Sequence, residues 1–404
     1  MSSKSPPNIV TLVLLAGIGA LSMNIFLPSL PALAEHFETD YATVQLAISA
    51  YLGVIGALQL VIGPLSDRYG RRPVMLSALA IFCVATLGCL FAPSIEVFLA
   101  FRALQAAIAA GIVLSRAIVR DMVPDDQAAS MIGYVTMGMS LVPMVGPIAG
   151  GWLDATFRWE ASFIALFLFG LGVFLLAYAD QGETNKNPSA NFTEQFRAYP
   201  ELLRARRFWG YSLTAAFASG AYFAFLGGAP FVASEILNLS SAEVGTWFAG
   251  PAIGYMIGNY LSGRYTRRVG MNRMMLAGGI VATFGTLVAL SLFAAGVYHP
   301  ISLFGPIALI GVGNGMTLPS ANAGIVSVRP KLAGSASGLG GTLMIGGGAV
   351  LAALTGFFLT QDSGPWPLLI VMFVASSLSI VSTLYVILRA RTVAAESAQK
   401  ANAT

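Results

Sequence analysis

The sequence predicts an all-α membrane protein with twelve transmembrane helices in two pseudo-symmetric six-helix halves. The first observation is composition, because 56% of the 404 residues are hydrophobic and only 10% are charged, whereas about a quarter of the residues of a soluble domain are charged. Second, apolar runs of about 20 residues, long enough to cross a bilayer, recur along the chain. Third, a charged, glycine-containing segment occurs once in each half, which indicates an internal repeat.

The repeated segment reads GPLSDRYGRR at residues 63–72 and GRYTRRVGMNR at residues 263–273. The two copies share both glycines and an arginine at matching positions, and each lies between two apolar runs. Charged side chains are costly near hydrocarbon, so such a cluster must lie where two helices leave the bilayer. The repeat indicates a molecule built from two similar halves.

Apolar runs define the expected transmembrane helices. Those of the first half are Ile9–Leu33, Val44–Leu65, Pro73–Phe91, Ile95–Val119, Ala128–Leu153 and Glu160–Ala179. Those of the second half are Phe208–Val232, Ala242–Ser262, Met274–Val297, Ile301–Val326, Gly334–Phe358 and Trp366–Leu388. We therefore expect an N-terminal six-helix bundle at residues 1–180, a cytoplasmic linker at 181–207, and a C-terminal six-helix bundle with a short tail at 208–404. Aromatic residues among the arginines of the linker suit a helix on the membrane surface, and a flexible tether is the alternative.

Basic residues indicate how the chain crosses the membrane. Lys and Arg gather in short cytoplasmic loops. Every Lys and Arg of this chain except Arg102 and Arg158 falls, by the predicted helices, on the same side of the membrane as the two termini. We therefore expect both termini in the cytoplasm. The net charge of +4 does not indicate a nucleic-acid partner, because the basic residues are dispersed over many loops and form no concentrated patch.

The residues that enzymes and metal sites need form no recognisable pattern. His36 and His299 lie far apart near predicted periplasmic loops, and no metal or nucleophile constellation appears. Cys83 and Cys89 share one apolar run, where a thiol is usually a small buried hydrophobe, so we infer no disulfide. The sequence has no Gly-x-x-x-x-Gly-Lys-Ser/Thr segment, the phosphate-binding loop of ATP-driven proteins. We predict a protein that is not an enzyme and that needs neither a metal nor a cofactor.

Several motifs resemble those of one transporter family. The segment at residues 63–72 resembles the loop between the second and third helices of the major facilitator superfamily, the large class of twelve-helix secondary transporters. The segment NIFLPSLP at residues 24–31 is similar to the Asp-x-x-Leu-Pro-x-Leu-Pro element of its Bcr/CflA drug-resistance members. Residues 222–232 and 332–338 resemble helix 7 and the start of helix 11 of those members. The resemblance implies a monomeric exporter of the bacterial inner membrane that uses the proton gradient.

The resemblance also implies a gate at the repeated loop. Its gating residues would be Gly63, Asp67, Arg68 and Gly70. In transporters with this motif the carboxylate closes a cytoplasmic latch with nearby arginines and the positive end of helix 11, which Ser335 or Ser337 would cap here. We assign Arg71 and Arg72 mainly to membrane topology, and the alternative is that all the arginines of this loop only fix topology.

Arg102 lies inside a predicted helix, where an arginine costs at least about 2.5–3.5 kcal/mol, so it must serve a purpose. Residues 102–106, RALQA, resemble the Arg-x-x-Gln-Gly element of antiporters in the superfamily. The resemblance links Arg102 to proton transfer or to the polarity of the cavity. The alternative is a structural arginine that is satisfied by backbone carbonyls.

A glycine- and proline-rich segment ends the fifth predicted helix. Small residues four positions apart let another helix approach closely, and proline bends the axis, so on residue chemistry alone this is a packing and hinge element. Its form, Gly-Pro-x-x-Gly-Gly, also resembles the element that marks antiporters. The hinge residues would be Pro143, Gly146, Pro147, Gly150 and Gly151.

Proton coupling lacks an obvious carrier, because Asn24 stands where the family has an aspartate and an amide does not exchange a proton near neutral pH. No acidic residue is expected deep in a helix. The residues considered for coupling are Asn24, Arg102, Asp154, Glu160 and Glu235. The substrate cavity should lie between the halves, lined from helices 1, 4, 7 and 10 by Phe26, Gln105, Tyr222, Phe223, Asn314 and Asn322.

Aromatic walls with few polar groups suit a mid-sized, partly apolar compound. We therefore expect an exporter of drugs, antibiotics or similar amphipathic compounds that works by proton antiport and alternating access. The alternative is an exporter of a metabolite, a siderophore or a lipid precursor, with altered or absent proton coupling.

Overall fold

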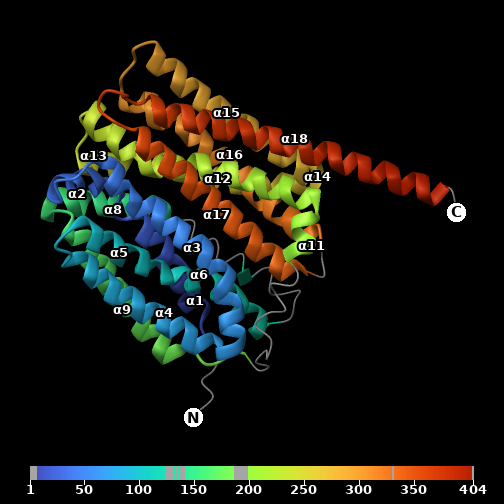
Figure 1. Ribbon diagram of the computed structural model, residues 1–404, viewed down its shortest axis with the longest axis horizontal. Coiled ribbons are helices and arrows are strands. Elements are labelled where there is room, and N and C mark those ends of the chain that lie inside the picture. The colour runs from blue at the N-terminus through green and yellow to red at the C-terminus, as the bar shows by residue number, and fades with distance from the viewer. Residues whose placement is uncertain are drawn as a thin grey trace.

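The computed structural model describes residues 7–123, 131–132, 135, 142–185, 199–329 and 332–402, and within them the chain forms helices and no strand. The prediction of an all-α membrane fold is confirmed. Figure 1 shows two groups of helices side by side, the N-terminal half in blue to green and the C-terminal half in yellow to red. The helices of both groups run roughly parallel or antiparallel to one another.

The helices have the following bounds. The N-terminal half contains α1 (Ile9–Asn24), η1 (Leu27–Ser29), α2 (Leu30–His36), α3 (Tyr41–Tyr69), α4 (Arg71–Leu90), α5 (Ile95–Gln105), η2 (Ala106–Ile108), α6 (Ala109–Met122), α8 (Val142–Phe157) and α9 (Glu160–Asp180). After it come α11 (Tyr199–Arg204), α12 (Arg206–Phe231), η3 (Val232–Ile236), α13 (Ser241–Trp247), α14 (Ala249–Val269), α15 (Met271–Ala294), α16 (Pro300–Ser327), α17 (Ala333–Phe358) and α18 (Trp366–Asn402).

Ten helical segments of the described chain are long and apolar enough to cross a membrane. The two predicted spans not among them have separate explanations. The span predicted at Ala128–Leu153 lies partly outside the described residues, and its part from Val142 onward belongs to α8. The span predicted at Ala242–Ser262 forms α13 and α14, which meet at Phe248, and the mean hydropathy of α14 is low because polar residues extend into it.

Two glycines turn the chain sharply at matching places in the two halves. Gly70 joins α3 to α4 with φ 97°, and Gly270 joins α14 to α15 with φ 86°. Residues other than glycine rarely adopt a backbone conformation with positive φ. The shared glycines of the repeated segment are therefore explained by one local geometry that occurs twice.

We call the end of the helices at which α9 finishes and α12 begins the linker end, and the opposite end the far end. At the far end, α8 of the N-terminal half packs against α13 of the C-terminal half, and Figure 1 shows the labels of α2, α8 and α13 close together there. Along one side of the molecule, α3 lies against α17. The halves are therefore in contact at the far end.

The linker is described at its two ends, and residues 186–198 lie outside the described residues. Residues 181–185 pack on the N-terminal half, and α11 packs on the C-terminal half through the fully buried side chain of Leu202. Glu201 of α11 also pairs with Arg329 at 2.7 Å. The start of the linker is thus packed on the N-terminal half and its end on the C-terminal half. The middle of the predicted surface helix lies outside the described residues.

Candidate functional site

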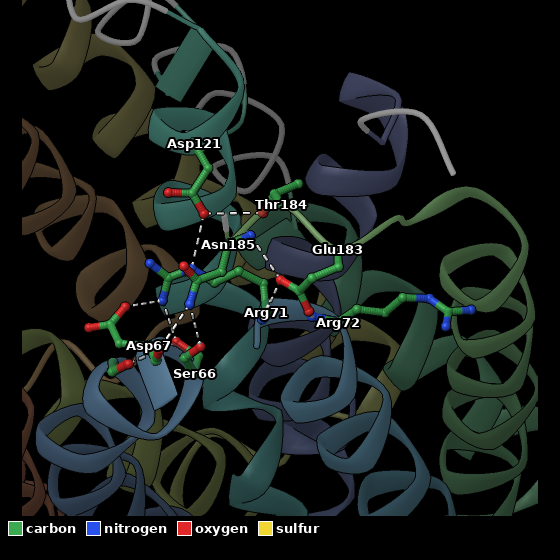
Figure 2. Close-up of polar contacts among 9 residues, drawn as sticks. Ser66, Asp67, Arg71, Arg72, Asp121, Glu183, Thr184 and Asn185 are labelled. Carbon is green, nitrogen blue, oxygen red and sulfur yellow. Dashed lines mark hydrogen bonds and ion pairs between the residues drawn. The ribbon is translucent and has the colours of Figure 1, made fainter. Parts of the chain in front are cut away.

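A cluster of charged and polar side chains occupies the linker end of the N-terminal half. Figure 2 shows Arg71 between two carboxylates, those of Asp67 and Asp121. The Arg71 guanidinium lies 2.5 Å from Asp67 and 3.1 Å from Asp121, and it also donates to the hydroxyl of Ser66. We call this set, which consists of Ser66, Asp67, Arg71, Asp121, Glu183, Thr184 and Asn185, the gate cluster.

Local helix geometry brings these groups together. Asp67 lies in the last turn of α3, and Arg71 is the first residue of α4, just past the turn at Gly70. Asp121 lies near the end of α6. One guanidinium with an 11% exposed side chain therefore joins three helices, and charge-assisted hydrogen bonds of this kind are stronger than neutral ones.

The linker completes the gate cluster. The carboxylate of Glu183 accepts hydrogen bonds from the backbone N–H groups of Arg71 at 2.9 Å and Arg72 at 3.1 Å. These N–H groups begin α4, where a helix lacks internal acceptors and carries partial positive charge. Asn185 donates from Nδ2 to the carbonyl of Asp67 at 2.9 Å. The Glu183 carboxylate also fills the space that a side chain at Gly70 would need, which is a second reason for glycine there.

The geometry differs from the expected latch in three ways. Arg68 lies over the ring of its neighbour Tyr69, 5.4 Å from the ring centre, and it is Arg71, assigned earlier to topology, that pairs with Asp67. The prediction that Ser335 or Ser337 caps helix 11 is wrong, because α17 begins at Ala333 and its N-cap is Leu332, which makes no side-chain hydrogen bond within the described chain. The sequence expectation failed because spacing alone does not show which arginine of a loop faces the neighbouring helix.

Two other members of the loop have simpler surroundings. Gly63 lies inside α3, and a side chain there would meet open space within the described part of the chain. Arg72 donates from Nε to the carbonyl of Gln181 at 2.8 Å and from Nη2 to that of Tyr178 at 3.1 Å. Arg72 therefore binds the end of α9 and the start of the linker to the N-terminal half.

Replacing Arg71 with glutamine is expected to lower the melting temperature of the purified protein by several degrees. The variant loses both ion pairs. The pair with Asp67, whose side chain is 42% exposed, is worth only about 0–1 kcal/mol, and hydrogen bonds to charged groups that are less exposed contribute about 1.5–3 kcal/mol each. The matched control is Arg68→Gln. It removes an arginine of the same loop whose guanidinium lies over the ring of the adjacent Tyr69. Equal melting temperatures for the two variants in a thermal unfolding scan would contradict the assignment of Arg71 as the centre of the cluster.

Arg102 is completely enclosed by the N-terminal half, with 1% of its surface exposed. Its Nε donates to the carbonyl of Ala47 at 3.1 Å, and Nη1 donates to the side chains of Ser22 at 2.9 Å and Gln105 at 2.6 Å. Nη2 donates to the carbonyl of Ser22 at 2.8 Å. The guanidinium also lies between two aromatic rings, 4.3 Å from the centre of Phe26 and 4.0 Å from that of Tyr51.

This environment stabilises the charge of Arg102 without an acid. Among the described residues, the groups that accept its hydrogen bonds are carbonyls, a hydroxyl and an amide, and the aromatic faces add cation–π attraction. Gln105 in turn donates to the hydroxyl of Thr86 at 2.8 Å, so the network joins α1, α3, α4 and α5. The geometry favours the alternative in which Arg102 is a structural arginine.

The residues expected to line a cavity fall into two groups. Phe26, Gln105, Asn24 and Asn314 are buried, with exposures of 1%, 0%, 3% and 3%. Tyr222 and Phe223 of α12 keep intermediate exposure, and Asn322 of α16 is exposed. The structure therefore places the first group within the helix packing, and only the second group is accessible from outside the packed interior.

Asn24 ends α1, and its Nδ2 donates to the carbonyl of Ala20 at 2.7 Å. Within the described chain, its Oδ1 accepts no hydrogen bond, and the same is true of Oδ1 of Asn314. Gly146 of α8 lies directly against Asn24. The amide is thus held by its own helix and by the glycine-rich helix α8.

The glycine-rich helix α8 contacts both halves. A side chain at Gly150 would overlap the carbonyl of Ile25, and one at Gly151 would overlap the carbonyl of Ser241 in the other half. In return, Gly245 of α13 lies against the carbonyl of Pro147. These contacts are backbone to backbone, so only glycine permits this approach. The side chain of Pro143 lies outside the described residues.

The acidic candidates lie toward the far end. Asp154, near the end of α8, is partly buried and lies close to the hydroxyls of Ser29 and Ser241, so it faces the contact between the two halves. Glu235 is exposed and accepts a hydrogen bond from Gln361 at 3.1 Å. Glu160 pairs with Arg158 at 3.5 Å. In the described part of the chain, no group of His, Cys, Asp and Glu side chains is arranged to hold a metal ion.

Comparisons with known proteins agree with this architecture. The family model of the Major Facilitator Superfamily matches residues 12–350 and again 221–403. The chain is 30% identical to "Multidrug resistance protein D" of Escherichia coli strain K12 over 365 residues, which covers 90% of this chain and 92% of the relative. It is also 30% identical to "Chloramphenicol resistance protein" of Pseudomonas aeruginosa over 344 residues, with 83% and 81% covered.

Among solved structures, a bacterial homolog of the human lysosomal transporter Spinster, in an inward-facing and unoccupied conformation, superposes with a TM-score of 0.71. The sequence identity is 18%, and the match covers 95% of this chain and 96% of that one. At this identity the likeness shows a shared fold.

Proposed function

Since the chain belongs to the major facilitator superfamily, we propose that it exports drugs, antibiotics or similar small amphipathic compounds by proton antiport and alternating access. The observation that carries this proposal is the similarity, over most of the chain, to relatives named for multidrug and chloramphenicol resistance. The contact between α8 and α13 at the far end supports alternation, because contacts of this kind between halves must form and break in turn.

We place the linker end in the cytoplasm. The basic residues of the gate cluster and of both repeated loops lie at this end, and Lys and Arg gather on the cytoplasmic side of short loops. Both termini then face the cytoplasm, and the far end faces the periplasm of a bacterial inner membrane. The protein would act as a monomer in the lipid bilayer, with the proton gradient as its energy source and no resident cofactor.

Asp154 is the acid that we assign to proton coupling. It is partly buried beside Ser241 of the opposite half, so its environment changes whenever the halves separate at the far end. Arg102 has no acidic partner among the described residues, and Asn24 carries no titratable group. A carboxylate at the contact between the halves is therefore better placed to couple protonation to opening than either of them.

Replacing Asp154 with asparagine is expected to abolish proton-coupled export while leaving the protein folded. The change keeps the shape of the side chain and removes its ability to carry a proton. Glu235→Gln is the matched control, because Glu235 is an exposed carboxyl at the same end. Transport is measured at several imposed pH gradients. If the transport rate of Asp154→Asn depends on the pH gradient as strongly as that of the unmodified protein, Asp154 is not the proton carrier.

The second function candidate is an exporter of a metabolite, a siderophore or a lipid precursor with altered coupling. Asn24 favours it, because the amide stands where the family has an acid. Asn24→Asp tests the idea: altered coupling predicts that the new acid increases the dependence of transport on the pH gradient. Equal dependence before and after the change would show that Asn24 has no part in coupling.

The proposed drug export is tested by resistance. Expression in a bacterial strain that lacks its own exporters should raise the inhibitory concentration of chloramphenicol, bicyclomycin, a sulfonamide or a cationic dye at least about fourfold for one compound. Asp154→Asn, present in the membrane at equal amount, should remove the increase. If the strain tolerates none of these compounds better, although the protein is verified in the membrane, drugs are not the substrate class of this protein.

A further inference from the structure

Helix α3 of the N-terminal half inserts two polar side chains into the C-terminal half near the far end. They are Tyr41 and Gln45, one helical turn apart on the same face. Tyr41 is 8% exposed and Gln45 is fully buried. A buried polar side chain between two rigid bodies needs a partner in the opposite body, because an unpaired one is costly.

The donor groups of both side chains find that partner in the backbone of the other half, whereas Oε1 of Gln45 accepts no hydrogen bond within the described chain. Nε2 of Gln45 donates to the carbonyl of Ala352 in α17 at 2.7 Å, and Oη of Tyr41 donates to the carbonyl of Gly227 in α12 at 2.7 Å. The ring of Tyr41 also packs on that of Phe231, with 4.9 Å between ring centres. Two helices of the C-terminal half are thus joined to one helix of the N-terminal half.

The C-terminal half has glycines where the amide of Gln45 enters. A side chain at Gly227 would overlap Nε2 of Gln45, and one at Gly356 would overlap its Oε1. The two glycines belong to α12 and α17, so the amide lies in a socket between them. Alanine, the next larger residue, would already close this socket from either side.

The bonds are also suited to repeated breaking. A carbonyl inside a helix already accepts a hydrogen bond from the N–H four residues later, so those of Ala352 and Gly227 keep a partner when α3 withdraws. The freed donors of Tyr41 and Gln45 would meet water in an open far end. A hydrogen bond that is exchanged for one to water has a small net value, and opening also brings water to the unpaired Oε1 of Gln45. The contact therefore favours closure without making it permanent.

We propose that Gln45 and Tyr41, together with Gly227 and Gly356, form the lock that holds the far end closed. The gate cluster lies within one half, whereas these four residues connect the two halves directly. The proposal rests on the alternating access put forward under the proposed function, and its readout is the opening of the far end, whatever compound is transported.

The test measures how fast a buried cysteine reacts. Val244 is 2% exposed and precedes Gly245, whose backbone lies against α8. We therefore use Val244→Cys, in a protein with Cys83→Ser and Cys89→Ser, to report far-end opening to a soluble maleimide in nanodiscs. We expect Gln45→Ala to speed labelling about threefold to tenfold, the change that the loss of one net hydrogen bond produces. Tyr41→Phe, which removes a single oxygen, should also speed labelling.

The glycines provide the decisive comparison. Gly356→Ala should speed labelling when Gln45 is present and should have little effect in the Gln45→Ala background, because the alanine then fills vacated space. The control Gln361→Ala, a glutamine at the same end that bonds within the C-terminal half, should leave the rate unchanged. A second reporter, Val297→Cys, is 43% exposed and should react at one rate in every variant.

Two results would overturn the proposal. One is a labelling rate that neither Gln45→Ala nor Tyr41→Phe changes. The other is an equal effect of Gly356→Ala in both backgrounds, which would mean that this glycine does not act through Gln45. Because labelling needs no substrate, a protein that exports none of the tested drugs would still confirm or refute the lock.

Discussion

Replacing Arg102 with alanine is expected to destabilise the N-terminal half so far that transport is lost. The change leaves the carbonyl of Ser22, at the end of α1, and Oε1 of Gln105 without this donor. It also removes the bond to the carbonyl of Ala47, which keeps its partner within α3, and it opens a void beside Phe26 and Tyr51. Each buried polar group left without a partner costs about 1–3 kcal/mol, and a whole domain is stable by only about 5–15 kcal/mol. The melting temperature and the yield of folded protein should both fall.

Comparison variants separate the structural role of Arg102 from a role in proton transfer. Arg102→Lys should recover little, because one ammonium group does not reach the acceptors that the planar guanidinium serves. Arg264→Ala, which removes an exposed arginine of α14, should melt like the unmodified protein. If Arg102→Ala keeps its melting temperature and still loses transport, the structural assignment is wrong and Arg102 acts in coupling.

Gly151→Ala is expected to reduce transport by about tenfold or more without unfolding the protein. The added methyl group would overlap the backbone of Ser241 in the opposite half, and a backbone, unlike a long side chain, does not rotate out of the way. Overpacking typically costs about 1–3 kcal/mol, and here the cost falls on the state in which α8 and α13 are in contact. The far end would therefore close less often.

Gly172→Ala is the matched control for Gly151→Ala. Gly172 lies in α9, where an added methyl group would meet no other described residue, and both variants place alanine within a helix. Initial transport rates and labelling of Val244→Cys should differ from the unmodified protein only for Gly151→Ala. Normal transport by Gly151→Ala would contradict the role given to the contact between α8 and α13.

Much of the fold is predictable from the sequence, because the helices of a membrane protein must be long and apolar. The repeated loop also predicts the two halves, since glycine is needed twice for the same turn, at Gly70 and Gly270. The first predicted helix is correct in position, but the structure breaks it after Asn24 and continues it to His36. The prolines at Pro28 and Pro31 lie in this region, and proline interrupts a regular helix.

The candidate sites are less predictable, because their members meet only in three dimensions. Arg102 is recognisable as a buried charge, but its partners come from other helices. Glu183 is a single acid in a polar stretch, more than a hundred residues from the helix that it caps. Gln45 is one amide in an apolar run, and its acceptor at Ala352 is 307 residues away. No local pattern indicates such pairings.

Proton antiport by this protein is tested in inverted membrane vesicles with an imposed pH gradient that is followed by a fluorescent dye. Chloramphenicol, bicyclomycin, a sulfonamide and a cationic dye are added in turn. Proton antiport predicts that at least one compound dissipates the gradient in vesicles with the unmodified protein and that Asp154→Asn abolishes the response while Glu235→Gln keeps it. No dissipation by any compound, with the protein verified in the vesicles, would contradict drug and proton antiport as the function of this transporter.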